Sequence, residues 1–373
     1  MFPLQPLSLR TFLRTCLGAS LGVVGCALAL APVAAQPQPF PITIERSSDT
    51  GSLLDQLQPV RNNGTASPQR DQGDQLVRLG DQHYRQGAYA KAIATWRQAL
   101  ALYQDIGDDE GIGVTLDLIG LTYGDRGDYP EAEQALRQRL SIARLRKDFQ
   151  GQLYALNNLG TMLIQGGRGA NLDAAEVAFD EARTIAEDIG DLEGQGLSLS
   201  NLGLVAQGRG EYAKAVKRYE EALLFRQRGD NPAGELNTLN NLGHAYWSLQ
   251  DYDEAIGAYG AALNLAETLE KPYAQLRAMD GLITAHGTVG RVDRAMDLMT
   301  ERLTVAQDLG DIYQQFLAVK GFYTFYRSQG ELRTARSFLE RTIGLAQVLE
   351  DTQAETLLLD ELLQLNLTLA ADR

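Results

Sequence analysis

The sequence predicts an all-α fold: a right-handed α-solenoid of about seven helix pairs, closed by a C-terminal capping helix. Three observations lead to this prediction. The 373 residues are too many for one ordinary compact core, so several domains or a repeat array are expected. One motif recurs about every 40 residues along most of the chain, and no β-rich segment lies between its copies.

The motif is clearest at residues 240–259, NNLGHAYWSLQDYDEAIGAY, where Leu242-Gly243 is followed by Tyr246, Ala255 and Tyr259. The alanines lie 40 residues apart except for one step of 43, whose extra residues fall in the turn GGRGAN at residues 166–171. The pair recurs as Leu79-Gly80, Ile119-Gly120, Leu159-Gly160 and Leu202-Gly203, and the alanine recurs as Ala92, Ala132, Ala175, Ala215, Ala295 and Ala335.

Close packing of helices explains why the motif combines these residue types. Small residues at the glycine and alanine positions let two antiparallel helices approach each other, and a larger residue four positions after the alanine fills the space between successive pairs. A glycine between the two helices suits a left-handed helix end. One pair alone leaves an apolar face exposed, so stacking in series is the stable arrangement. The larger residues are Trp96, Leu136, Phe179, Tyr219, Tyr259, Met299 and Leu339.

This pattern resembles the tetratricopeptide repeat family, whose signature is met in full by Leu242, Gly243, Tyr246, Ala255 and Tyr259. The resemblance covers seven repeats, from residue 74 to about 355. The period of 40, in place of about 34, is similar to the long-helix variants of kinesin light chains, of Leu-Gly-Asn-type G-protein regulators and of many bacterial members. In repeats six and seven Ile283 and Tyr323 replace the glycine, which predicts looser or shifted packing there.

The N-terminus predicts export. Residues 1–35 combine Arg10 and Arg14 with an apolar run that ends in VAAQ, which is the pattern of a cleaved secretory signal peptide. Two alternatives stay open: VVGC at residues 23–26 resembles a lipoprotein box with Cys26 as the lipidated residue, or the segment remains uncut as an anchor. All three alternatives place the folded part in the periplasm or cell envelope of a bacterium, without membrane insertion once the signal is cleaved.

Composition divides the rest of the chain. Residues 36–72 are rich in Pro, Gln, Ser, Asn and Gly and predict a disordered linker, followed by the repeat array at residues 73–355 and the capping helix at residues 356–373. The net charge of −14 disfavours nucleic acid and anionic membrane surfaces as partners. Both cysteines, Cys16 and Cys26, precede the array, and no catalytic or metal-binding cluster is visible, so a non-enzymatic protein without a cofactor is expected.

The resemblance implies a binding surface on the concave face, which the first helix of each repeat lines. In the family this face receives extended peptides or partner helices. In the long-helix variants, asparagines of the first helix often bind the peptide backbone, because an amide both donates and accepts. Trp247 is expected to act as an aromatic anchor, and Asp280 and Arg327 extend the charged part of the face. The alternative is that the asparagines bond to neighbouring helices and that Trp247 is wedged between repeats. The expected binding residues are Asn157, Asn158, Asn201, Asn237, Asn240, Asn241, His244, Trp247, Arg277 and Lys320.

The last helix carries two leucine stripes. Leu358, Leu362, Leu365 and Leu369 are expected to close the stack. Leu359, Leu363 and Leu367 form a second stripe, which predicts self-association as a homodimer, whereas the alternative is burial of both stripes against repeat seven.

Together these features predict a non-enzymatic interaction scaffold of the cell envelope that binds a protein or peptide along its concave face. The alternative is a regulator whose superhelix changes shape when it binds a short secreted peptide.

Overall fold

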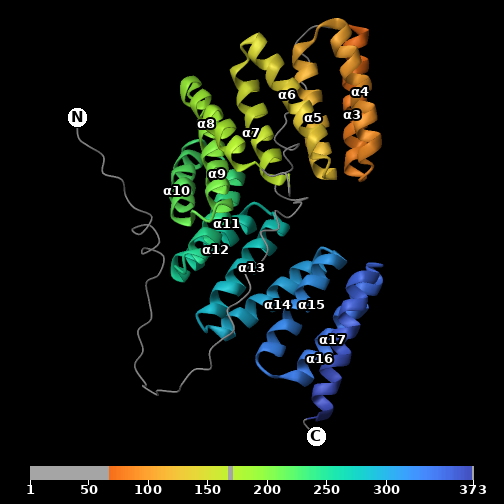
Figure 1. The fold of residues 1–373 in the computed structure, drawn as a ribbon, viewed down its shortest axis with the longest axis vertical. Coiled ribbons are helices and arrows are strands. Elements are labelled where there is room, and N and C mark those ends of the chain that lie inside the picture. Colours follow the sequence, from red (N-terminus) through yellow and green to blue (C-terminus); the bar gives the residue numbers. More distant parts are fainter. Residues whose placement is uncertain (1–66, 167–170, 372–373) are drawn as a thin grey trace, which may run out of the picture. The chain divides into compact units, whose positions relative to one another are not determined.

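A computed structural model describes residues 67–166 and 171–371, and there the prediction of an all-α fold is confirmed (Figure 1). These residues form fifteen helices and no strand. The predicted signal peptide, both cysteines including the lipidation candidate Cys26, and most of the predicted linker lie outside the described residues.

The helices divide into two compact units, residues 1–201 and 202–373, and the boundary falls within α9. The described part of the first unit holds α3 (Pro68–Arg85), α4 (Tyr89–Ile106), α5 (Asp109–Arg126), α6 (Tyr129–Arg146), α7 (Phe149–Gln165), α8 (Leu172–Ile189) and the start of α9 (Leu192–Gly208). The second unit holds the rest of α9, α10 (Tyr212–Arg228), α11 (Pro232–Ser248), α12 (Tyr252–Thr268), α13 (Pro272–Thr288), α14 (Val292–Asp308), α15 (Ile312–Ser328), α16 (Leu332–Val348) and α17 (Thr352–Ala371).

Odd-numbered helices from α3 to α15 are the first helices of seven pairs, and even-numbered helices are the second helices. Within each unit, neighbouring helices in the chain pack against each other, so successive pairs stack in order, as an α-solenoid requires (Figure 1). α17 is a first helix that follows the seventh pair, and it packs on α16.

The repeat glycine is the contact point between the two helices of a pair. A Cβ on Gly243 would lie 2.8 Å from the ring of Tyr259, well inside ordinary contact distance. The same close approach joins Gly80 to Trp96, Gly120 to Leu136, Gly160 to Phe179 and Gly203 to Tyr219. The large residues are almost fully buried, so the glycines create the space that these side chains fill.

Repeats six and seven lack this glycine, and other close contacts are found there. Gly281 stands two residues before Ile283, and a Cβ there would lie 2.4 Å from Tyr259 of the preceding pair. Tyr323, which replaces the glycine in repeat seven, is 3% exposed and packs with Leu339 in the core beneath α17.

Helix ends are fixed by a second repeated device. Aspartates before the first helices accept a hydrogen bond from the backbone N–H three residues later, as Asp148 does from Gly151 at 2.8 Å. A glutamine in the first turn then donates to the end of the preceding second helix, as Gln152 does to the carbonyl oxygen of Ala143 at 3.3 Å. Asp191 and Asp311 cap their helices in the same way, and Gln195 and Gln315 donate to the carbonyl oxygens of Ala186 and Ala306. They satisfy backbone groups that helix ends leave unpaired.

The outer boundaries of the array differ from those predicted. α3 begins at Pro68, within the segment predicted as linker, because Ser67 caps it and the side chain of Arg70, 1% exposed, forms an ion pair with Asp108 at 2.5 Å. α17 begins at Thr352, four residues before the predicted cap.

Candidate binding face

The predicted residues that meet on an accessible face belong to α11 and α13 of the second unit. Asn241 on α11 accepts a hydrogen bond from the guanidinium of Arg277 on α13 at 2.6 Å. Asn237 and His244 lie one turn on either side of Asn241 along α11, and Arg277 is exposed while the other three are half-buried. We call Asn237, Asn241, His244 and Arg277 the α11–α13 polar row.

His244 supplies a neutral imidazole to this row. Burial, and secondly the positive charge of Arg277, lower the pKa of His244 below its usual value near 6.5. The ring is therefore uncharged at neutral pH, with one nitrogen as donor and the other as acceptor. Its centroid lies 6.4 Å from that of Trp247.

Three polar atoms on α11 have no hydrogen-bond partner among the described residues: Asn240 Oδ1, His244 Nδ1 and Trp247 Nε1. They recur at helical spacing, so they share one side of α11. All three are screened from solvent, which means that a water or ligand atom reaches them only when side chains around them move. Trp247 is half-buried. Its exposure is therefore intermediate between the two alternatives from the sequence, an exposed aromatic anchor and a ring wedged between repeats.

Asn157, Asn158 and Asn240 are corrected from binding residues to packing residues in this structure. Their exposed fractions are 2%, 5% and 2%, so they do not present an amide to a ligand. Asn157 donates to the carbonyl oxygen of Leu153 at 3.0 Å and to Ser198 Oγ at 3.1 Å, on the next first helix. The physical reason is that an amide between two helices satisfies polar groups that packing has removed from water.

Asn201, half-buried, belongs to the same internal network in the first unit. Its amide donates to Asn157 Oδ1 at 2.9 Å. Asn158 in turn donates to Asp117 Oδ1 at 3.4 Å. The asparagines of the first unit therefore connect first helices to one another.

Two ion pairs, which the sequence reasoning missed, occupy equivalent places in repeats two and six. Arg139 pairs with Asp117 at 3.1 Å, and Arg302 pairs with Asp280. Both arginines stand where the other repeats have Ala or Thr, and an aspartate occurs at the partner position only in these two repeats. The joint occurrence of the arginine and the aspartate in these two repeats is the sequence pattern that indicates the ion pairs. Asp280, predicted to add charge to the binding face, is thus neutralised by Arg302.

Burial makes the first of these pairs unusual. Asp117 is 2% exposed, and burial raises the pKa of Asp117 to about 6 although Arg139 acts in the opposite direction. Arg139 also reaches Asp148, the N-cap of α7, at 3.3 Å, so it links two first helices.

Lys320 and Arg327 lie on α15. The ammonium of Lys320 is exposed and lies 5.9 Å from the centre of the Phe316 ring. Arg327 donates to the Tyr323 hydroxyl at 2.8 Å and lies 3.8 Å from a Glu361 carboxylate oxygen. Asp280 is paired to Arg302, and Arg277 on α13 and Lys320 on α15 are exposed cations.

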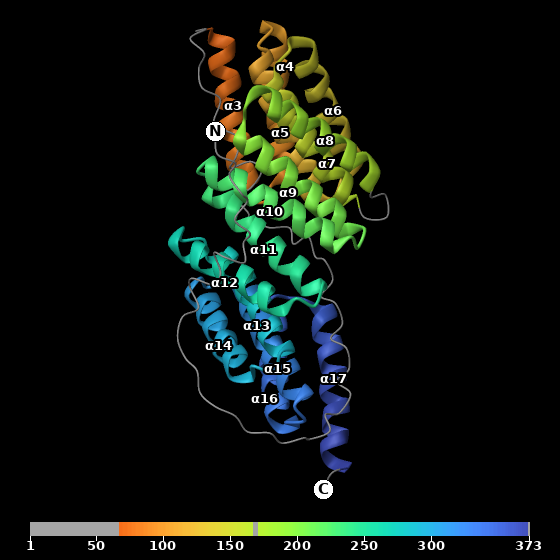
Figure 2. The ribbon, with the colours of Figure 1, turned by 90° about the vertical axis from the view of Figure 1, so that its left-hand side faces the viewer.

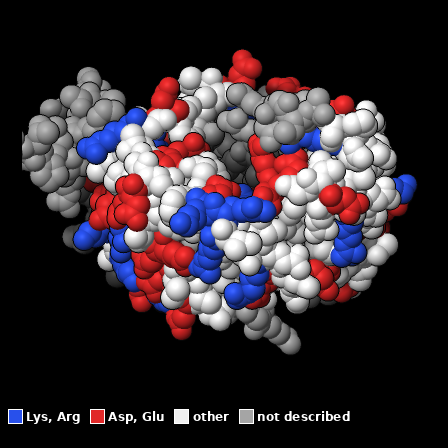
Figure 3. Space-filling view, turned by 90° about the horizontal axis from the view of Figure 1, so that it is seen from above, with Lys and Arg blue, Asp and Glu red and all other residues white. Residues whose placement is uncertain are grey.

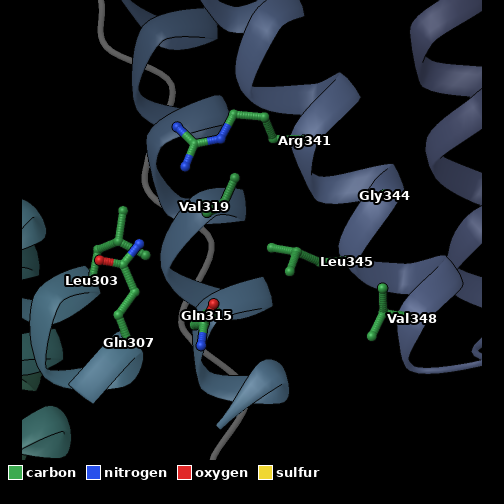
Figure 4. Close-up of a pocket in the computed structure, with 8 residues that line it drawn as sticks. All are labelled: Leu303, Gln307, Gln315, Val319, Arg341, Gly344, Leu345 and Val348. Carbon is green, nitrogen blue, oxygen red and sulfur yellow. The ribbon is translucent and has the colours of Figure 1, made fainter. Parts of the chain in front are cut away.

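A cavity of about 350 Å³ lies elsewhere, between α14, α15 and α16 (Figure 4). Gly344 of α16 is one of its lining residues. Its walls are mainly aliphatic, and Arg341 at its edge already lies over the Phe338 ring at 5.5 Å. The lining residues are Leu303, Gln307, Gln315, Val319, Arg341, Gly344, Leu345 and Val348.

The two leucine stripes of α17 separate as predicted. Leu358 and Leu365 are 3% and 6% exposed, and Leu362 and Leu369 pack against the same core. Leu359, Leu363 and Leu367 are 46%, 60% and 65% exposed, so this second stripe is not buried against repeat seven.

Other kinds of site find no support in the described residues. No group of three or more His, Cys, Asp or Glu side chains is placed to hold a metal ion there. None of the helices in the ranges 67–166 and 171–371 is long and apolar enough to cross a membrane. Basic and acidic side chains are interspersed on the face shown in Figure 3, which presents no extended single-sign surface.

Comparison with known sequences identifies the repeats. Profiles of the tetratricopeptide repeat match residues 75–144, 197–229 and 234–308. No curated protein matches the sequence.

Solved structures show the same fold. A signal transduction ATPase with numerous domains and a tetratricopeptide repeat sensor, from Pyrococcus horikoshii, has a TM-score of 0.57 at 20% identity, over 78% of this chain and 44% of that chain. RapI without ligand has a TM-score of 0.54 at 14% identity, over 75% and 99% of the two chains. A Rap protein complexed with competence and sporulation factor has a TM-score of 0.52 at 15% identity, over 81% and 77%.

Proposed function

Because the chain is a tetratricopeptide repeat protein, we propose that it is a non-enzymatic scaffold that binds an extended peptide or protein segment on the first helices of its second unit. The observation that carries this proposal is the α11–α13 polar row. Its amides offer donors and acceptors on one accessible face, which matches a peptide backbone that carries both.

The charge of the face specifies the ligand further. Arg277 and Lys320 are exposed cations on α13 and α15 in a chain of net charge −14. Arg277 is held in place by Asn241, so its position is fixed before a ligand arrives. The favoured ligand segment therefore carries a carboxylate, from an acidic side chain or from a chain end.

Defined probes test this proposal. The full chain is used to select binders from a random peptide library, and the affinities of selected peptides are then measured for Asn241→Ala and Arg277→Ala. Each variant is expected to lose about 10- to 100-fold in affinity, because it removes a hydrogen bond to a charged or fixed group. Peptides whose carboxylates are amidated should bind the native chain about as weakly as the unmodified peptides bind the two variants.

Matched controls lie on second helices of the same unit. Asn264→Ala on α12 and Arg294→Ala on α14 remove the same residue types from exposed positions and should leave affinity unchanged. Equal losses in controls and test variants, or no loss in either set, would place the binding surface elsewhere.

The alternative function is a regulator whose shape changes when it binds a short secreted peptide. The observation that favours it is the fold shared with a Rap protein complexed with competence and sporulation factor. Small-angle scattering with and without a selected peptide distinguishes the two functions, because a scaffold keeps its radius of gyration and a shape-changing regulator does not.

We further propose that the chain acts in the bacterial cell envelope after export, on the basis of residues 1–35. The mass of the N-terminal fragment of the mature protein tests this. Cleavage after Ala35 supports a secreted form, a lipid on Cys26 supports a tethered form, and an intact leader in the cytoplasmic fraction contradicts export.

A further inference from the structure

Two of the three exposed leucines of α17, Leu359 and Leu363, occupy positions that are covered in the complete repeats, whereas Leu367 corresponds to the exposed Arg327 and Gly287. One and two periods of 40 residues before Leu359 stand Val319 and Met279, which are 1% and 2% exposed, whereas Leu359 is 46% exposed. Leu363 corresponds to Tyr323 and Gly243, and Gly243 is covered by Tyr259 of the second helix. α17 packs on α16 with its other stripe, and among the described residues no helix covers this one. Figure 2 shows α17 beside α15 and α16 in the second unit.

This correspondence defines the shape of what would cover the stripe. In every complete pair the covering element is an α-helix that runs antiparallel to the first helix and presents apolar side chains to it. A helix suited to α17 therefore needs large apolar residues one turn apart along one side.

α17 itself meets that requirement. Leu359, Leu363 and Leu367 are spaced four residues apart and are symmetric about Leu363. Elsewhere in residues 67–166 and 171–371 the exposed large apolar residues are scattered, as Leu145 and Leu224 are, and form no second stripe of this kind. Two antiparallel copies centred on Leu363 place Leu359 of each copy opposite Leu367 of the other.

The charges of α17 favour the antiparallel arrangement. Glu355, Asp360 and Glu361 lie in its first half, and residues 362–371 carry no charge. Antiparallel pairing sets these acids beside an uncharged half-helix. Parallel pairing would set Asp360 against Asp360 of the second copy, which repels.

We propose that α17 is a self-association surface at which two copies of the chain pair through antiparallel α17 helices, related by a two-fold axis at Leu363. Such an interface is isologous, so it closes at two copies. Each α17 then serves the other as the missing second helix.

Sedimentation equilibrium of the full chain over a wide concentration range tests the proposal. The native chain is expected to show a monomer–dimer equilibrium, and Leu359→Lys and Leu367→Glu should each raise the dimer dissociation constant by about tenfold or more, because each puts a charge into an apolar contact. Leu224→Lys on α10 is the matched control, since Leu224 is 52% exposed on the same unit, and it should leave the constant unchanged.

Mixing variants tests the direction of the helices. Leu359→Lys mixed with Leu367→Glu should recover dimers, because antiparallel pairing brings the two new charges together. Leu359→Lys mixed with Leu359→Glu should not recover them. Recovery in the second mixture alone would show parallel pairing and overturn the proposal.

Two further outcomes would also overturn it. A native dimer that the α17 variants leave intact has its interface elsewhere. A native chain that is monomeric at every concentration leaves α17 to another occupant, which is a segment of the same chain if Leu363→Lys lowers thermal stability and a different protein if it does not. Neither result depends on peptide binding at α11 and α13.

Discussion

Replacing Gly203 with alanine tests whether the repeat glycines are required by close packing. A Cβ at this position would lie 2.4, 2.7 and 2.8 Å from three ring atoms of Tyr219. Ordinary contacts between carbon atoms are about 3.5–4.0 Å, so the ring or the helix would have to move by roughly 1 Å. Tyr219 is fully buried and its hydroxyl donates to Gln207 at 3.2 Å, so the ring has little room to move.

The expected size of the effect follows from two opposing terms. Gly→Ala inside a helix stabilises by about 1 kcal/mol through helix propensity. Overpacking in a well-filled core costs about 1–3 kcal/mol, and the short contacts place Gly203→Ala at about 2–3 kcal/mol. The net expectation is a loss of about 1–2 kcal/mol in the free energy of unfolding.

Gly260→Ala on α12 is the matched variant, because no atom lies within 4 Å of a Cβ there. It should stabilise by about 1 kcal/mol, so the difference between the two variants isolates the overpacking term at about 2–3 kcal/mol. Urea denaturation of both variants followed by circular dichroism measures this difference, with the slope checked for constancy. If Gly203→Ala proves as stable as Gly260→Ala, the close-packing explanation of the repeat is refuted.

Two further predictions concern pH. Because burial raises the pKa of Asp117 to about 6, the folded chain keeps a proton that the unfolded chain has lost, and the stability of the native chain relative to Asp117→Asn should fall on the order of 3 kcal/mol as pH rises from about 4 to 6. If the stability of the native chain relative to Asp117→Asn rises over this range, the charge of Arg139 outweighs burial and lowers the pKa of Asp117. His244 should behave in the opposite way: its pKa is lowered, so the unfolded chain takes up the proton first, and stability relative to His244→Gln should fall as pH drops below about 6.5. Nuclear magnetic resonance titration of the His244 ring checks the direction independently, and a pKa above the usual value would contradict it.

The fold followed from the sequence because its determinants are local and repeated. Each glycine and each large residue, such as Gly243 and Tyr259, meet within one helix pair, so their separation along the chain reports a contact directly. The burial of the first leucine stripe of α17 was also predictable from the sequence, because Leu358 and Leu365 follow helical spacing and pack on the adjacent helix.

The candidate site was only partly predictable from the sequence, because it depends on contacts between helices that are far apart in the chain. Asn240 and Asn241 are neighbours in the sequence, yet Asn240 is 2% exposed and Asn241 meets Arg277 on a half-buried face. Local spacing also does not fix the environment of one repeat position: Asn158 and Asn241 are equivalent in the repeat, yet Asn158 is 5% exposed and donates to Asp117, whereas Asn241 accepts from Arg277. Asp280 shows the same dependence, because Arg302, on a different helix, decides whether its charge is available.

The sequence by itself therefore determined the class of fold, the number of helix pairs and the residues that join each pair, because these contacts repeat with a fixed period. Only the tertiary structure decided which polar side chains remain accessible and that Leu359, Leu363 and Leu367 stay uncovered. Exposure depends on whether a neighbouring helix is present, and α17 has such a neighbour on only one of its two apolar sides among the residues described.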